Sequence, residues 1–156
     1  GGGASDYLEY AWVCAPNAAG QAITHNTITT LTIDTEIVDT GNHGSIAANQ
    51  ITLAGGTYYY KMHTSCITSD FSVTTTIFSL YNISDATYVN KLSGIFGYAF
   101  NSIIDNDGQF TITSQKVFEL RILVATSSIC GGNYYAFTNS TAGADQRTTI
   151  RLWKLA

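Results

Sequence analysis

Residues 53–66, LAGGTYYYKMHTSC, predict a β-strand with two different faces. After the glycine pair, large apolar side chains alternate with a second set of substantial ones: Tyr58, Tyr60 and Met62 against Tyr59, Lys61 and His63. Because successive side chains of a strand point to opposite faces, the first set is suited to a core. The second set needs a contact of its own, because this mixture of Tyr, Lys and His is unusual on a sheet face that meets only solvent.

The composition favours strands throughout the chain. Among 156 residues, 45% are hydrophobic and only 12% are charged, and there are 22 threonines and a single proline. β-Branched and aromatic side chains fit a pleated, half-buried surface. No helical amphipathic stretch of useful length occurs. The sequence therefore predicts an all-β protein whose length fits one domain.

Turn residues divide the chain into strand-sized segments. We expect residues 1–5, GGGAS, to be a linker or cloning remnant, and residues 6–156 to form one domain. Residues 39–45, 83–93 and 105–108 are predicted to be loops or turns, and 127–145 a long irregular stretch. The predicted strands are 7–15, 27–38 (one bent strand or a pair), 50–53, the strand after Gly56, 72–82, 94–104, 109–113, 116–126 and 148–155.

Charge and motifs argue against several functional classes. The net charge is −4 with only seven Lys and Arg, so we expect neither nucleic-acid binding nor a basic membrane patch. No apolar run reaches the ~20 residues that span a bilayer, so we expect no membrane insertion. Gly-x-Ser-x-Gly is absent, and His25, His43 and His63 lie in unrelated segments. We therefore expect that this protein is not an enzyme.

The acidic segment 105–108, DNDG, resembles a calcium loop only weakly. Asp105, Asn106 and Asp107 offer oxygen ligands, but Lys116 stands where an EF-hand needs Glu. A turn is the favoured interpretation, and no other cofactor is expected.

The three cysteines, Cys14, Cys66 and Cys130, match neither a disulfide framework nor a zinc pattern. We expect the three cysteines to be buried and to act as small hydrophobic side chains, in keeping with folding in a reducing cytoplasm. One disulfide plus a free thiol is the alternative.

Several local patterns occur in a particular order and end with a strand close to the last residue. They are IxLAGGTY (51–58), LYNISD (80–85), DGQFTIT (107–113), VFELR (117–121) and the final IRLWKL (150–155). This succession resembles the TNF/C1q-like jelly-roll heads found at the ends of bacteriophage tail fibres, over residues 6–155. The resemblance implies a two-sheet antiparallel jelly-roll sandwich that assembles as a homotrimer and binds a receptor or glycan. No collagen-like stalk is present in the chain.

The resemblance also offers a role for the second face of the opening strand. It places the strands that begin at Thr57 and Lys116 in one sheet that faces the threefold axis. Their core-facing side chains would be Tyr58, Tyr60, Met62, Phe118, Leu120 and Ile122. The predicted trimer interface is Tyr59, Lys61, His63, Glu119, Arg121 and Leu123, with ion pairs among Lys61, Glu119 and Arg121. The alternative is a solvated sheet face with incidental ion pairs.

Two loops are candidates for ligand recognition, because binding residues concentrate on loops carried by a rigid scaffold. The first lies within 129–143 and combines rings with adaptable amides and a hydroxyl: Asn133, Tyr134, Tyr135, Phe137, Asn139 and Ser140. The second contains Tyr88 and Asn90. The mixture suits carbohydrate binding, but the same rings would also suit packing of the loop or sealing of a subunit boundary.

The function expected from these observations is a non-enzymatic receptor-binding head of a phage fibre or tail protein. Its partners would be two further copies of itself and a host surface glycan or protein. It would be made in the host cytoplasm, carried on the virion and act extracellularly. Alternatives are a structural trimerisation or capsid-decoration knob without a ligand, and a secreted C1q/TNF-type ligand.

Overall fold

The computed structural model describes residues 6–14, 19–69, 72–97, 102–131 and 145–156, which form thirteen β-strands and, among these residues, no helix. The predicted all-β class is confirmed. The strands are β1 (Asp6–Cys14), β2 (Gln21–Ile23), β3 (Thr29–Thr30), β4 (Thr35–Asp39), β5 (Gly44–Ala47), β6 (Gln50–Leu53), β7 (Gly56–Thr68), β8 (Val73–Asn82), β9 (Thr87–Gly97), β10 (Ser102–Ile112), β11 (Lys116–Val124), β12 (Ser128–Cys130) and β13 (Asp145–Lys154).

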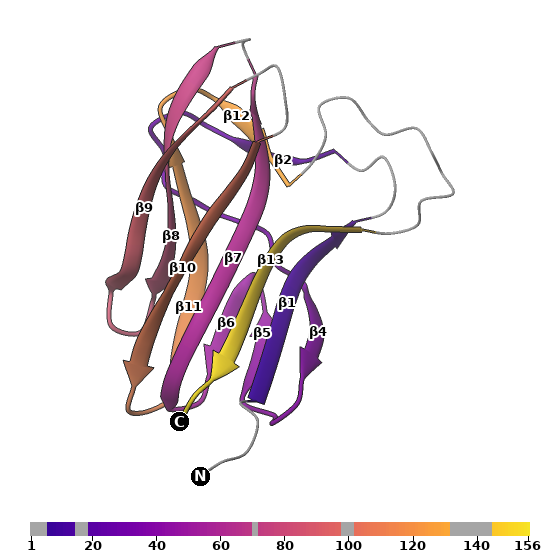
Figure 1. The fold of residues 1–156 in the computed structure, drawn as a ribbon. Helices are drawn as coiled ribbons and strands as arrows, with labels where there is room; N and C mark the ends of the chain where they lie inside the picture. The colour runs from indigo at the N-terminus through magenta and orange to yellow at the C-terminus, as the bar shows by residue number, and fades with distance from the viewer. Residues whose placement is uncertain (1–5, 15–18, 70–71, 98–101, 132–144) are drawn as a thin grey trace.

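The strands form two antiparallel sheets that pack face to face (Figure 1). Sheet A has the order β2-β12-β7-β13-β1-β4, and its seventh strand, β10, pairs with β7 outside this order. Sheet B has the order β5-β6-β11-β8-β9, with β3 also paired to β11. Asp6 is opposite Lys154, so the start of β1 and the end of β13 lie at the same end of the molecule.

The core lies between the sheets and is filled by alternate residues, as predicted. Tyr58, Tyr60 and Met62 from β7 are at most 1% exposed, and so are their counterparts Phe118, Leu120 and Ile122 from β11. The ring of Phe110 joins the two groups, with ring centroids 5.5 Å from Tyr58 and 5.1 Å from Phe118. The fold therefore rests on the two-residue period visible in the opening stretch.

Of three predicted loops or turns, two are shorter than predicted and the third is wrong. Residues 40–43 and 83–86 do lie between strands, but the predicted loop 39–45 also includes the start of β5, and residues 87–93 form more than half of β9. The DNDG segment lies inside β10, which pairs with β7 over eleven positions. Asn106 makes this possible because its side chain, although fully buried, is satisfied: Tyr60 Oη donates to Oδ1 (3.0 Å), and Nδ2 donates to the Phe78 carbonyl (2.8 Å).

The strands that begin at Thr57 and Lys116 do not share a sheet, which corrects a central prediction. The first is β7 of sheet A and the second is β11 of sheet B. Alternation along each strand is as predicted, but their outward faces lie on opposite sides of the sandwich. Sequence periodicity defines the faces of a strand and carries no information about which sheet holds it.

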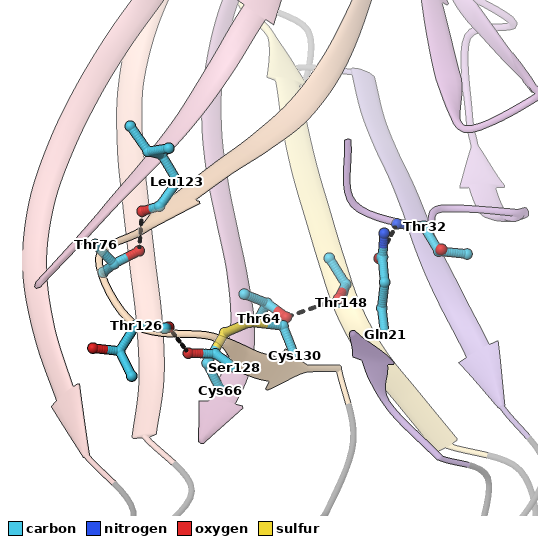
Figure 2. Close-up of a disulfide and its surroundings, with 10 residues drawn as sticks. All are labelled: Gln21, Thr32, Thr64, Cys66, Thr76, Leu123, Thr126, Ser128, Cys130 and Thr148. Atoms are coloured by element: carbon cyan, nitrogen blue, oxygen red, sulfur yellow. Dashed lines mark hydrogen bonds between the residues drawn. A yellow bond between two sulfur atoms is a disulfide. The ribbon is translucent and has the colours of Figure 1, made fainter. Parts of the chain in front are cut away.

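The prediction that all three cysteines are merely buried hydrophobes is also wrong. Cys66 of β7 and Cys130 of β12 are directly opposite in register and form a disulfide with Cα atoms 4.1 Å apart (Figure 2). Both are fully buried, and Cys14 is buried on β1 outside this bond. The bond fastens to β7 a three-residue strand whose other edge holds β2. A disulfide is typical of proteins that mature or act outside a reducing cytoplasm.

Candidate functional site

Four neighbouring strands of sheet A, in the order β10, β7, β13 and β1, present an outward face made of two rows of side chains. We call this surface the outer face of sheet A. The registers align the first row as Gln109, Tyr59, Trp153 and Tyr7, and the second as Asp107, Lys61, Arg151 and Glu9. Two of the predicted interface residues, Tyr59 and Lys61, thus lie in these rows.

Three of the four residues in the first row are aromatic. Trp153 lies between two tyrosines, with ring centroids 5.6 Å from Tyr59 and 5.4 Å from Tyr7, and all three side chains are only partly buried. Tyr7 Oη donates a hydrogen bond to Glu9 Oε2 (3.0 Å). Burial and this bond raise the pKa of Tyr7, so its hydroxyl stays protonated. Three adjacent rings on a sheet face are a large apolar surface for water to cover.

The second row is charged at every position, with two cations, Lys61 and Arg151, between the flanking carboxylates of Asp107 and Glu9. Arg151 Nε lies 3.3 Å from Glu9 Oε1, and Glu9 is nearly buried although Arg151 is exposed. Lys61 is exposed and stands opposite Asp107 in the register, beside Arg151 on its other edge. The row therefore presents a pre-formed ion pair between Arg151 and Glu9, and a second exposed cation, Lys61, outside that pair.

His63, the third predicted interface residue on β7, follows in the next row. It lies between Asp105 and Thr149, and Thr149 Oγ1 is within 3.0 Å of its ring nitrogens. Burial and the neighbouring Arg151 lower the pKa of His63, so the neutral imidazole is favoured at neutral pH. His63, Lys61 and Arg151 line a hollow of about 300 Å³ together with residues of β10.

The three metal candidates do not point the same way. Asp105 and Asp107 are exposed on the outer face of sheet A, whereas Asn106 points into the core. Across the described ranges, no cluster of three His, Cys, Asp or Glu side chains is arranged to hold a metal ion. The alternation of a strand separates ligands that a calcium turn would have gathered.

The three predicted interface residues of β11 lie on the outward face of sheet B: Glu119, Arg121 and Leu123. Lys61 is on the opposite side of the sandwich. Their predicted ion pairing with Lys61 on one sheet face is wrong. Arg121 instead pairs with Glu119 on its own strand (Nε–Oε1 2.6 Å) and stacks 3.4 Å from the ring centroid of Tyr81. Arg121 Nη1 also donates to Tyr88 Oη (3.3 Å).

The second predicted loop is part of a strand. Tyr88 and Asn90 lie in β9, where Tyr88 packs against Tyr81 with ring centroids 4.8 Å apart. The Asn90 side chain donates to Asn106 Oδ1 (3.3 Å) and to the Asp107 carbonyl (3.2 Å), which links the two sheets. Asn90 therefore has a structural role, while Tyr88 belongs to the Arg121 cluster.

The first predicted loop lies outside the described residues. Asn133, Tyr134, Tyr135, Phe137, Asn139 and Ser140 all fall within 132–144, and their role stays a prediction. The described chain ends before them at Gly131, next to the disulfide, and resumes at Asp145.

The sequence reasoning missed Tyr7, Glu9, Arg151 and Trp153, which complete the outer face of sheet A. A signal for them existed. Both terminal strands show alternation, YLEY at 7–10 and RLWK at 151–154, with Leu8 and Leu152 directed inward. Only the pairing of the two terminal strands brings these side chains beside Tyr59 and Lys61.

Comparison with known proteins supports the fold at the level of structure only. No protein-family model and no curated protein matches the sequence. Solved structures do match. Murine APRIL superposes with a TM-score of 0.59 at 8% identity, over 97% of this chain and 99% of that chain. The fold is a TNF/C1q-like jelly roll.

Two further structures extend the likeness. The globular domain of zebrafish complement 1qA gives a TM-score of 0.55 at 10% identity, covering 97% of this chain and 98% of that one. The PRD1 vertex protein P5 gives 0.52 at 14% identity, covering 99% and 100%. The described residues contain no helix long and apolar enough to cross a membrane.

Proposed function

We propose that this chain is a non-enzymatic receptor-binding head of a phage fibre or tail protein, and that it assembles as a homotrimer through the outer face of sheet A. The composition of the outer face of sheet A is the observation that carries the proposed assembly. Three adjoining aromatic rings, a nearly buried Glu9 paired with Arg151 and the exposed Lys61 form a surface rich in the residue types favoured at interfaces. The fold likeness to a vertex protein supports a place on a virion.

The corrected interface replaces Glu119, Arg121 and Leu123 by residues of the terminal strands. Trp153 lies at its aromatic centre, and buried Trp side chains often dominate the energy of an interface. The charges of the second row, negative at both ends and positive at the two central strands, then set the register between subunits, because a shifted subunit would bring like charges together.

Sedimentation velocity at micromolar concentration tests the assembly. We expect the wild-type chain to sediment as a trimer and Trp153→Ala to dissociate at concentrations at least about tenfold higher than wild type. Tyr81→Ala is the matched control, because it removes a half-buried ring from the outward face of sheet B. A wild-type monomer, or equal dissociation of the two variants, contradicts the proposed interface.

Adsorption of the fluorescently labelled head to a panel of bacterial strains tests receptor binding. Saturable binding to some strains supports it, and a head that binds none of a broad panel would instead be a structural knob. The likeness to a vertex protein also supports this second candidate, the structural knob. In the predicted loop, the double substitution Tyr134→Ala and Tyr135→Ala is expected to weaken adsorption while the protein stays folded.

A further inference from the structure

The outward face of sheet B carries an open apolar groove of about 680 Å³. We call it the sheet B groove. It runs over the ends of β8, β9 and β11, and its outward lining residues are Thr75, Ile77, Ser93, Ile95, Leu123 and Ala125. Ile95 is 70% exposed and adjoins the other apolar side chains of the groove, Ile77 and Leu123, so the apolar surface here is contiguous.

One end of the sheet B groove is cationic. Ile77 and Leu123 also line a smaller hollow of about 90 Å³ that contains Tyr88, Lys91 and Arg121. Arg121 is held in place by Glu119 and by the ring of Tyr81. Lys91 Nζ lies 4.2 Å from the ring centroid of Tyr88.

These contacts orient the cations before any ligand arrives. Arg121 pairs with the nearly buried carboxylate of Glu119, and Lys91 adds a second positive charge beside it, so the end of the groove has a local positive excess. The chain as a whole carries a net charge of −4. A ligand with a negative group would therefore meet a complementary charge at this end of the groove.

We propose that the sheet B groove binds a segment of a protein receptor, with apolar side chains of that segment in the groove and a carboxylate at Lys91 and Arg121. This inference rests on the proposed receptor-binding function and names the class of partner. The surface remains accessible when the outer face of sheet A is covered, because the two faces lie on opposite sides of the sandwich.

A glycan fits the groove poorly. Sugars bind through many hydrogen bonds and through stacking on free ring faces, whereas the lining is mostly aliphatic. The rings of Tyr81 and Tyr88 are already covered by Arg121 and Lys91. An acyl chain also fits poorly, since residues of a single sheet and Asn26 form the floor and leave the other side to water. An extended peptide suits such a groove, because its backbone polar groups can stay hydrated.

Three single variants and one double variant test the inference in the strain-adsorption assay. Ile95→Glu introduces a carboxylate into the apolar part, and Lys91→Glu reverses the charge at its end. Ala47→Glu is the matched control, because it adds the same group to an exposed position on β5, at the far edge of sheet B. The loop double variant, Tyr134→Ala with Tyr135→Ala, reports on the alternative binding region.

We expect both groove variants to raise the concentration for half-saturation about tenfold or more, with Ala47→Glu unchanged. The three single variants should retain the wild-type melting temperature and oligomeric state, because the side chains of Ile95, Lys91 and Ala47 are exposed. Treatment of the cells with proteinase K should abolish adsorption, and mild periodate oxidation of their glycans should leave it intact.

The outcomes separate the two proposals. Adsorption that is equal in wild type and groove variants overturns the groove and leaves the receptor-binding head standing, as does loss in the loop variant alone. Adsorption that is sensitive to periodate and resistant to protease overturns the protein partner. A wild-type head that adsorbs to no strain overturns both.

Discussion

Removal of the Cys66–Cys130 disulfide is expected to cost a large part of the stability of this domain. The two cysteines are 64 residues apart in the sequence. In the chain-entropy treatment, a crosslink closing a loop of that size stabilises the folded state by about 4 kcal/mol. The substitutions Cys66→Ala and Cys130→Ala together remove the crosslink and both of its sulfur atoms, so neither partner is left as a new thiol.

Urea unfolding at a fixed protomer concentration measures this cost, since the proposed assembly would make stability depend on concentration. With a urea dependence of about 2 kcal/mol per molar, the midpoint should fall by about 2 M. Cys14→Ala is the control for deleting a buried sulfur without opening the crosslink. It should lower the free energy of unfolding by only about 1 kcal/mol.

The loss should also have a local signature. β12 pairs with β7 and with β2 over three residues each, so these two short strands depend most on the bond. Hydrogen exchange of their amides should accelerate more in the double variant than exchange along β1 and β13. A free energy of unfolding within about 1 kcal/mol of wild type, or uniform acceleration of exchange, would refute this account of the disulfide.

Three further predictions concern the core and sheet A. Asn106→Ala should destabilise the protein by about 2–4 kcal/mol in urea unfolding, because it leaves the Phe78 carbonyl without its buried donor; the exposed Gln109→Ala should cost little, and equal losses would contradict the role of Asn106. The lowered pKa of His63 means that the unfolded chain binds more protons between the folded pKa and about 6.5. Stability should therefore be full above pH 6.5 and fall below it, and His63→Gln should flatten this dependence in melts from pH 5 to 8; an unchanged slope would exclude His63 as its source. Millimolar calcium should leave the melting temperature unchanged, because Asn106 points away from Asp105 and Asp107; a rise that disappears in Asp105→Asn would restore the calcium site.

Much of the fold was predictable because strand periodicity is a local property. The alternation of residues 58–63 and 118–123 identified the core-facing side chains of β7 and β11 correctly. The DNDG segment misled for an equally local reason: its composition is that of a turn, yet a buried hydrogen-bond network around Asn106 keeps it in a strand. The hydrogen bonds that decide this come from Tyr60 and Phe78, far away in sequence.

The candidate site was predicted in part. Tyr59, Lys61 and His63 do share an outward face, but their neighbours are Trp153, Arg151 and other side chains of the terminal strands rather than those of β11. Strand order depends on long-range pairing, which a single sequence does not encode in any local pattern.

The sequence by itself determined the all-β class and the core-facing side chains of β7 and β11, because a two-residue period and a composition rich in β-branched and aromatic residues act within each strand. Tertiary structure alone decided which strands are neighbours. It joined Cys66 to Cys130, placed Trp153 beside Tyr59 and separated Lys61 from Arg121 by the thickness of the sandwich. Those contacts arise from the burial of both sheets at once, a property of the whole chain and not of any segment.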